Sequence, residues 1–161
     1  MVLLKKLAKI SHFIRNKLKY GFLSKLSNIK FMGENHKIES GVRIIGRTSN
    51  SITIDGDFYC NANCHFYGDI DIGKHVMIGP KTIIWSRNHN FEKGMIYKHI
   101  GHRNDKIVIG NNVWIGASVI LLPGVIIPNN TVIAAGSVVT KAFAAENTVI
   151  GGNPARVLKE I

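Results

Sequence analysis

The chain has 161 residues, of which 45% are hydrophobic and 19% are charged, and its formal net charge is +11. This length suits one domain with a substantial core, and this composition excludes an intrinsically disordered chain. No apolar run reaches the roughly 20 residues that a membrane-spanning helix needs, so no transmembrane helix is expected.

Residues 1–30 are predicted to form a basic amphipathic helical segment. Most of the positive charge lies there, since the segment has eight Lys or Arg residues and no acid. Because no RNP motif, zinc-finger spacing or basic zipper accompanies that charge, nucleic acid is not an expected partner. Two roles stay open for residues 1–25: capping one end of the next domain, which we favour, or resting on an anionic membrane surface. The apolar face of the predicted helix consists of Leu3, Leu4, Leu7, Ile10, Phe13, Ile14 and Leu18.

Residues 31–152 are predicted to form an all-β solenoid built on a six-residue repeat. A helix would repeat every 3.6 residues and a half-buried strand every two, so neither explains this spacing. A six-residue unit fits a short strand plus a corner, and three such sides close one triangular turn. A β-sandwich would space its turns irregularly, which disfavours it. The inward positions are Ile54, Cys60, Phe66, Ile72, Ile78 and Ile84 in one run, and Ile109, Ile115, Leu121, Ile127, Ile133 and Val139 in the next.

Small residues follow several of these inward positions directly, among them Gly73, Gly79, Gly110 and Gly116. We expect them to supply the unusual backbone angles of the corners. The chain then departs from the repeat twice. Residues 85–102 are polar and rich in His and Asn, which predicts a protruding functional loop. Residues 153–161 are predicted to form a short C-terminal helix.

The two cysteines, Cys60 and Cys64, are too few for a disulfide scaffold. Both occupy inward positions, so we interpret them as small core residues and not as metal ligands. No secretory signal is recognisable, which predicts a cytoplasmic protein, with peripheral membrane contact if residues 1–25 bind lipid.

A set of motifs lies between Ile72 and Pro154: IGKHVMIGP, a loop with RNHN, IGNNVWIGASVILLPGV, AAGSVVTK and GGNPARV. Together they resemble the hexapeptide-repeat acyltransferases, and within them the maltose, galactoside and capsule-sugar O-acetyltransferases. Streptogramin-type antibiotic acetyltransferases are similar as well. The resemblance implies a left-handed parallel β-helix, a homotrimer with active sites between neighbouring subunits, and acetyl-CoA as the cosubstrate.

Acetyl transfer from a thioester needs a base for the hydroxyl proton and donors for the oxyanion. His89 matches the family's catalytic histidine, and a neutral imidazole suits a general base near neutral pH. A solvated surface histidine is the alternative. A zinc site from His89, His99 and His102 is disfavoured, because NVWIG and VVTK are marks of acyltransferases, so no metal is expected.

The resemblance also assigns the acetyl-CoA contacts. Trp114 would lie against the pantetheine arm, unless it only packs on a solenoid face. Ala117 and Ala135 would offer their backbone amides, although the family often has Ser in place of Ala117. Near the phosphates, the resemblance places Thr140, Lys141 and Arg156, each of which could instead be a solvated surface residue.

The segment FYCNANCHFYGD resembles the sugar-holding segment of the galactoside enzymes, which assigns Asn61 and Asp69 to the acceptor. The spacing from Asp69 to the next repeat differs from that of the galactoside enzymes by a small deletion. The expected function is O-acetylation of a sugar hydroxyl in a surface polysaccharide, a lipopolysaccharide or a related glycan. Antibiotic O-acetylation, amino-sugar N-acetylation and a non-enzymatic trimeric solenoid remain as alternatives.

Overall fold

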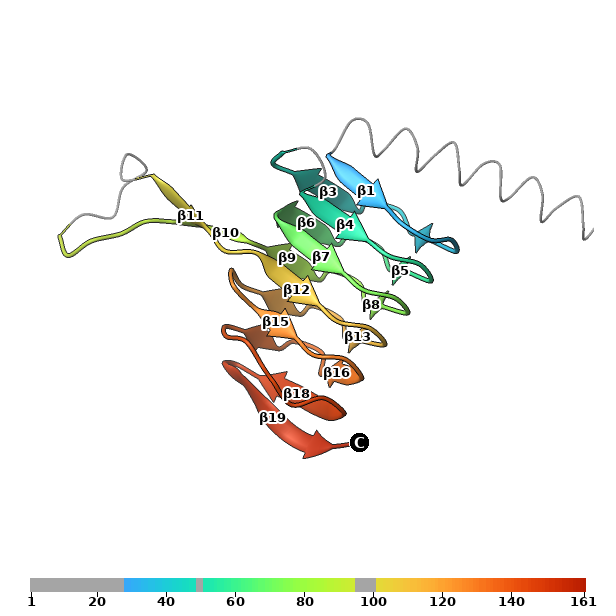
Figure 1. Ribbon diagram of the computed structural model, residues 1–161. Coiled ribbons are helices and arrows are strands. Elements are labelled where there is room, and N and C mark those ends of the chain that lie inside the picture. The colour runs from blue at the N-terminus through green and yellow to red at the C-terminus, as the bar shows by residue number, and fades with distance from the viewer. Residues whose placement is uncertain (1–27, 49–50, 95–100) are drawn as a thin grey trace, which may run out of the picture.

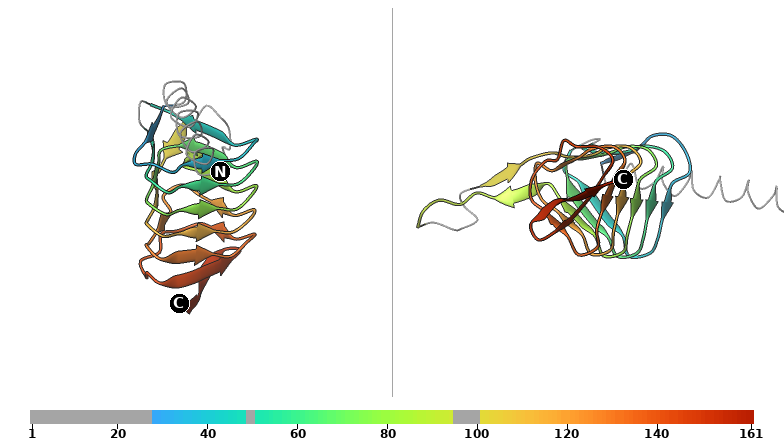
Figure 2. Two further views of the ribbon diagram at one scale, coloured as in Figure 1. Left: turned by 90° about the vertical axis from the view of Figure 1, so that its right-hand side faces the viewer. Right: turned by 90° about the horizontal axis from the view of Figure 1, so that it is seen from below.

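The computed structural model describes residues 28–48, 51–94 and 101–161. These residues form short strands that wind into a solenoid of stacked triangular turns (Figures 1 and 2). Residues 1–27 of the predicted helical segment lie outside the described residues, and so do both of its suggested roles. Its last two residues, Ile29 and Lys30, form part of a strand, so the prediction of a helical segment reaching residue 30 is wrong there. Among the described residues, no helix has the length and apolar character needed to cross a membrane.

Three parallel sheets form the three sides of the solenoid. Sheet A contains β1 (Ile29–Phe31), β4 (Ile52–Ile54), β7 (Ile70–Ile72), β12 (Ile107–Ile109) and β15 (Ile126–Ile127). Sheet B contains β2 (Lys37–Ile38), β5 (Tyr59–Cys60), β8 (Met77–Ile78), β13 (Trp114–Ile115), β16 (Thr131–Ile133) and β18 (Thr148–Gly152). Sheet C contains β3 (Arg43–Gly46), β6 (His65–Gly68), β9 (Ile83–Trp85), β14 (Ile120–Leu121) and β17 (Val138–Val139).

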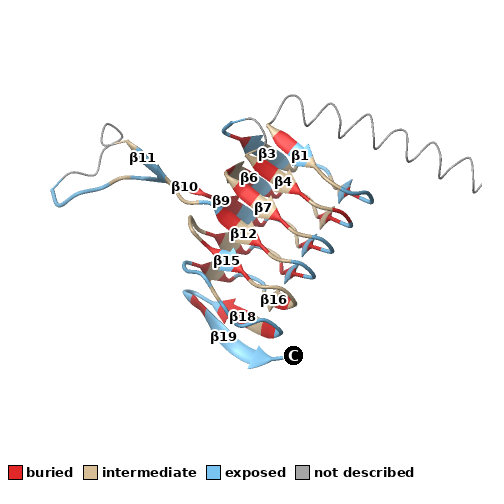
Figure 3. Cartoon of the chain, viewed as in Figure 1, coloured by how far each residue is buried: buried red, intermediate tan, exposed pale blue. Residues whose placement is uncertain are grey.

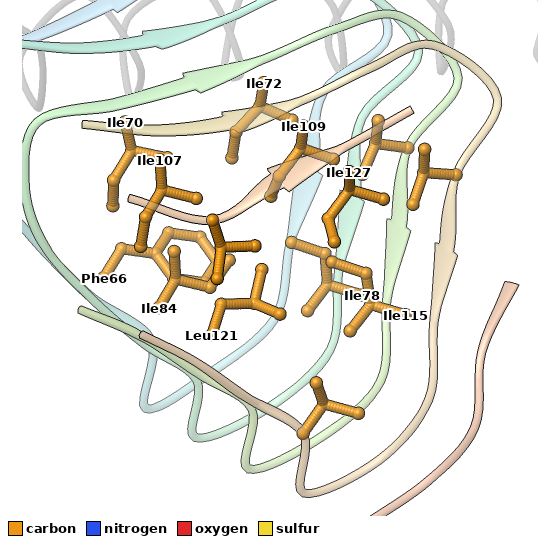
Figure 4. Close-up of a cluster of buried hydrophobic side chains, with 14 of the residues drawn as sticks. Phe66, Ile70, Ile72, Ile78, Ile84, Ile107, Ile109, Ile115, Leu121 and Ile127 are labelled. Atoms are coloured by element: carbon orange, nitrogen blue, oxygen red, sulfur yellow. The ribbon is translucent and has the colours of Figure 1, made fainter. Parts of the chain in front are cut away.

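The inward side chains of successive turns stack into one apolar core. On sheet A, for example, Ile72 pairs in register with Ile54 on one side and with Ile109 on the other. Figure 4 shows these side chains meeting inside the solenoid, and Figure 3 shows buried and exposed residues alternating along the strands. Every inward residue predicted from the six-residue repeat is buried, Cys60 and Cys64 included. The repeat and the core it predicts are therefore confirmed.

The corners differ from the prediction in one respect. The glycines that directly follow inward residues do not have a positive φ angle. The positive φ occurs two residues after each of these glycines, as at His75, Lys81 and Asn112. The glycines serve close approach instead: a Cβ on Gly79 would lie 2.6 Å from the backbone nitrogen of Ala117 in the next turn. Small residues are thus needed there because neighbouring turns touch.

A hairpin interrupts the solenoid between β9 and β12, as the polar stretch 85–102 predicts. Its arms are β10 (Arg87–His89) and β11 (His102–Asn104), which pair antiparallel. Figure 1 shows both arms projecting away from the stacked turns. Since β9 belongs to sheet C and β12 to sheet A, the hairpin leaves the solenoid at the corner between these two sheets.

The C-terminal helix predicted over residues 153–161 is wrong. Residues Ala155–Glu160 form strand β19, which runs antiparallel to β18. The physical reason lies in the edge of sheet B, where the backbone groups of β18 would face solvent without a further strand. The chain reverses at Asn153–Pro154 and covers this edge, a tertiary requirement that outweighs local helical preference.

Candidate active site

His89, the predicted base, is the last residue of β10 and is exposed. The hairpin register places it opposite His102, and the two ring centroids lie 4.2 Å apart with an interplanar angle of 45°. The backbone N–H of His89 donates a hydrogen bond to the Asn88 side-chain oxygen at 3.0 Å. The sequence resemblance identified His89, whereas its partner depends on a cross-strand register that the sequence does not reveal.

Positive charge surrounds this imidazole pair. The pKa of His102 lies below its ordinary value, first because the ring loses water contact and then because Arg87, His89 and Arg47 oppose a further positive charge. His102 is therefore neutral at neutral pH. A neutral ring keeps His89 free of a charged neighbour, which suits a residue that must accept a proton.

A groove runs along the outer side of sheet B and its corner with sheet C. Its volume is about 440 Å³. Trp114, at 54% exposure, and Met77, at 50%, form its apolar wall. The other lining residues are mostly small, and the lining as a whole consists of Tyr59, Asn61, Met77, Ile78, Gly79, Pro80, Trp114, Gly116, Ala117, Val132, Ile133, Ala134 and Ala135.

Two backbone amides open into this groove without an internal partner. Over residues 28–48, 51–94 and 101–161, the N–H groups of Ala117 and Ala135 donate no hydrogen bond. Two turns before Ala117 in the same column, by contrast, the N–H of Ala62 donates to the Asn61 side-chain oxygen at 2.7 Å. Backbone donors without partners favour a ligand that brings acceptors, such as the amide carbonyls of a pantetheine arm.

The remaining predicted residues lie farther along the solenoid. Thr140 and Lys141 follow β17 at the corner between sheets C and A, and both are exposed. The Lys141 ammonium lies 5.9 Å from the centroid of the Phe143 ring. Arg156 belongs to β19 at the end of sheet B and donates a hydrogen bond to the Pro154 carbonyl at 3.2 Å.

Asn61 and Asp69 do not meet within one chain. Asn61 lies in the corner between sheets B and C, whereas Asp69 lies in the corner between sheets C and A, 4.0 Å from Arg47. Apart from Arg156, the predicted residues thus fall into two groups on opposite edges of sheet C. The hairpin corner carries Asp69, His89, Thr140 and Lys141, and the groove corner carries Asn61, Trp114, Ala117 and Ala135.

No group of three or more His, Cys, Asp or Glu side chains arranged to hold a metal ion occurs in the part of the chain that the structure describes. His99, one of the three histidines considered for zinc, lies outside that part.

The chain is similar to proteins of known activity. The family model "Bacterial transferase hexapeptide (six repeats)" matches residues 106–141. The galactoside O-acetyltransferase of Escherichia coli K12 is 37% identical over 137 residues, which are 81% of this chain and 63% of that protein. This chain therefore spans less than two thirds of that relative's length.

Two solved structures share the fold. A maltose O-acetyltransferase from Clostridium difficile 630 has a TM-score of 0.76 and 30% identity, with 92% of this chain and 88% of that chain covered. A hexapeptide-repeat acetyltransferase from Vibrio cholerae, solved with acetyl coenzyme A, has a TM-score of 0.75 and 28% identity, covering 90% and 77%. Together with the three parallel sheets, these likenesses confirm the left-handed parallel β-helix.

Proposed function

Because the chain belongs to the hexapeptide-repeat acetyltransferase family, we propose that it transfers an acetyl group from acetyl-CoA to a sugar hydroxyl. The observation that carries this proposal is the pair of unpartnered amides, at Ala117 and Ala135, in a groove walled by Trp114. A long amphipathic thioester carrier fits such a groove, because its chain is apolar and its amide carbonyls need donors. Acetyl-CoA bound to the Vibrio cholerae relative supports the same donor.

The groove and the base would come from two copies of the chain. Sheet C separates the hairpin corner from the groove corner, and its outer face exposes Ile45 and Ile83. Exposed apolar side chains gathered on one face favour contact with another subunit. A homotrimer with sheet C toward the threefold axis would bring each hairpin corner to the next copy's groove corner, which completes three identical sites.

The reaction follows from these groups. The acceptor oxygen attacks the thioester carbonyl as Nε2 or Nδ1 of His89 takes the hydroxyl proton. The carbonyl oxygen becomes an oxyanion, which a groove amide stabilises. When this intermediate collapses, the bond from carbon to sulfur breaks, and the protonated His89 returns the proton to the departing thiolate. The products are the acetyl ester and coenzyme A with a free thiol.

Charged and polar groups at the two corners would hold the rest of both substrates. Thr140, Lys141 and Arg156 are exposed donors for the coenzyme A phosphates. The side-chain NH₂ of Asn61 and the carboxylate of Asp69 are hydrogen-bonding groups suited to sugar hydroxyls. We propose a glycan acceptor and a cytoplasmic location, with residues 1–25 as a cap on the solenoid and peripheral membrane contact as the less favoured alternative.

The test is release of free thiol from acetyl-CoA in the presence of galactosides, maltose and oligosaccharides of surface glycans. We expect turnover with at least one of these sugars, and a loss of about a hundredfold or more in His89→Ala. Streptogramins and amino sugars serve as competing acceptors. If no acceptor releases thiol above the rate of spontaneous hydrolysis, the proposed transfer is refuted.

A further inference from the structure

A continuous strip of side chains leads from sheet C to the proposed base. Trp85, Arg87 and His89 alternate along β9 and β10, so they point to the same side of the extended chain. Figure 1 shows β9 beside β6 and continuing into β10. Acetyl transfer at His89 does not by itself need Trp85 or Arg87, and the sequence motifs assign neither of them.

The strip begins with two stacked aromatic rings. Tyr67 of β6 is in register with Trp85 of β9, and their ring centroids lie 4.5 Å apart with an interplanar angle of 20°. Trp85 is 41% exposed, although large aromatic side chains are usually more buried. An exposed indole held rigid by a second ring forms a flat apolar platform.

Arg87 connects this platform to the histidine pair. Its guanidinium donates a hydrogen bond from Nη1 to the Tyr67 hydroxyl at 3.1 Å. Its charge also reaches His102, whose pKa it helps to lower. The platform, the guanidinium and the imidazoles are therefore one connected surface.

Arg87 differs from its cationic neighbours in its partners. Arg47 lies 4.0 Å from the Asp69 carboxylate, and Arg103 lies 2.6 Å from the Asp105 carboxylate. Arg87 has no carboxylate partner among the described residues. A guanidinium without an anion beside a catalytic base favours a ligand that supplies one.

We infer that Tyr67, Trp85 and Arg87 form an acceptor subsite for a pyranose ring that carries an anionic group, an inference that rests on the proposed acetyl transfer at His89. The C–H face of the ring would lie on Trp85, since that face is apolar and flat. The anionic group, a carboxylate or a phosphate, would bind Arg87. The strip then directs a hydroxyl of the same sugar toward His89.

Pairs of sugars that differ only in an anionic group distinguish the contact of the ring with Trp85 from the contact of the anion with Arg87. Methyl glucuronide and methyl glucoside share one ring and differ at a carboxylate, as do the corresponding galacturonide and galactoside, and glucose 1-phosphate represents the phosphate source. Binding is measured by ligand-observed NMR and turnover by thiol release. The variants are Trp85→Ala, Trp85→Phe and Arg87→Gln. Arg103→Gln is the control, because it removes the same charge from the opposite face of the hairpin.

We expect the native protein to prefer an anionic sugar over its neutral counterpart by about tenfold or more. Arg87→Gln should abolish that preference, while Arg103→Gln keeps it. Trp85→Ala should weaken every pyranoside about tenfold, with Trp85→Phe restoring most of the loss and the KM for acetyl-CoA constant.

Three results would overturn the inference: equal binding of acidic and neutral sugars, unchanged binding in Arg87→Gln, or a smaller assembly in Trp85→Ala by light scattering. The last would assign Trp85 to the contact between copies. Anionic sugar binding that depends on Arg87 but yields no thiol would uphold the subsite and refute acetyl transfer, so the two failures are distinguishable.

Discussion

His89 and His102 face each other across the β10–β11 hairpin, with their ring centroids 4.2 Å apart. The hairpin is the one described departure from the six-residue winding between Ile84 and Ile107, and its paired strands β10 and β11 have this pair at one end. A positive charge on His89 is one of the causes that lower the pKa of His102.

The first prediction concerns the pH dependence of the reaction. The pKa of His102 is lowered by the loss of water contact and by the charges of Arg87, His89 and Arg47. Protonation of His102 is therefore expected only below the ordinary histidine range, and it should add a step to the acidic limb of kcat/KM. In His102→Asn this step should be absent, with kcat at pH 8 within about threefold of native. Identical profiles of kcat/KM against pH would show that the rings do not interact in the enzyme.

The second prediction concerns acid stability. His36 is buried beside Phe31, and burial lowers its pKa. The unfolded chain binds a proton near pH 6.5 while the folded chain resists it, so stability is full above that pH and falls as the pH drops toward the folded pKa. Tm should therefore fall less between pH 7.5 and 5.5 in His36→Gln than in the native protein.

The control for this prediction is His75→Gln, which replaces an exposed histidine. It should lose Tm with acid as the native protein does. Equal losses in the native protein and in His36→Gln would show that the burial of His36 does not cause the acid sensitivity.

The third prediction compares two reasons for glycine in this fold: contact between neighbouring turns at Gly116 and a positive φ angle at Gly136. A Cβ on Gly116 would lie 2.6 Å from the Ala135 nitrogen, so Gly116→Ala should force neighbouring turns apart and cost about 1–3 kcal/mol of unfolding free energy. Gly136 has open space but a left-handed angle, so Gly136→Ala should cost about 1 kcal/mol. Chemical denaturation measures both, and Gly116→Ala should also raise the KM for acetyl-CoA. A Gly116→Ala variant as stable as the native protein would contradict the close approach of the turns.

The fourth prediction tests the groove wall. Trp114→Ala should raise the KM for acetyl-CoA about tenfold and leave Tm unchanged, because its side chain is 54% exposed and supports little of the core. Ile126→Ala, an exposed aliphatic residue on sheet A, is the matched control and should change neither quantity. A normal KM in Trp114→Ala would place the acetyl-CoA arm elsewhere.

The core could be predicted from the sequence because burial in this fold follows a local rule. Each turn repeats the same three sides, so the inward position of Ile115 is evident without knowing what Ile115 touches. The role of the corner glycines was not evident in this way, since Gly79 matters through the approach of Ala117 in the next turn.

The candidate site was predictable only in part. Motifs identified His89 and Trp114 one by one, but they did not indicate that the two lie on opposite edges of sheet C. The stacking of Tyr67 on Trp85 and the bond from Arg87 to Tyr67 depend on register between strands, which no single motif encodes. The sequence does not predict strand β19. This strand pairs with the backbone groups at the exposed edge of β18, and such pairing produces no periodic pattern in the sequence.

The most direct measurement is activity in mixed assemblies of two inactive variants. His89→Ala lacks the proposed base, and Ala117→Phe fills the groove; each alone should release thiol about a hundredfold more slowly than the native protein. When both are co-expressed with different tags and the mixed forms of the proposed trimer are purified, about one in three of the interfaces should join a native His89 to a native groove. We expect the rate of thiol release to recover in proportion to the number of these interfaces. Mixed trimers as inactive as either parent would contradict a site shared between neighbouring copies.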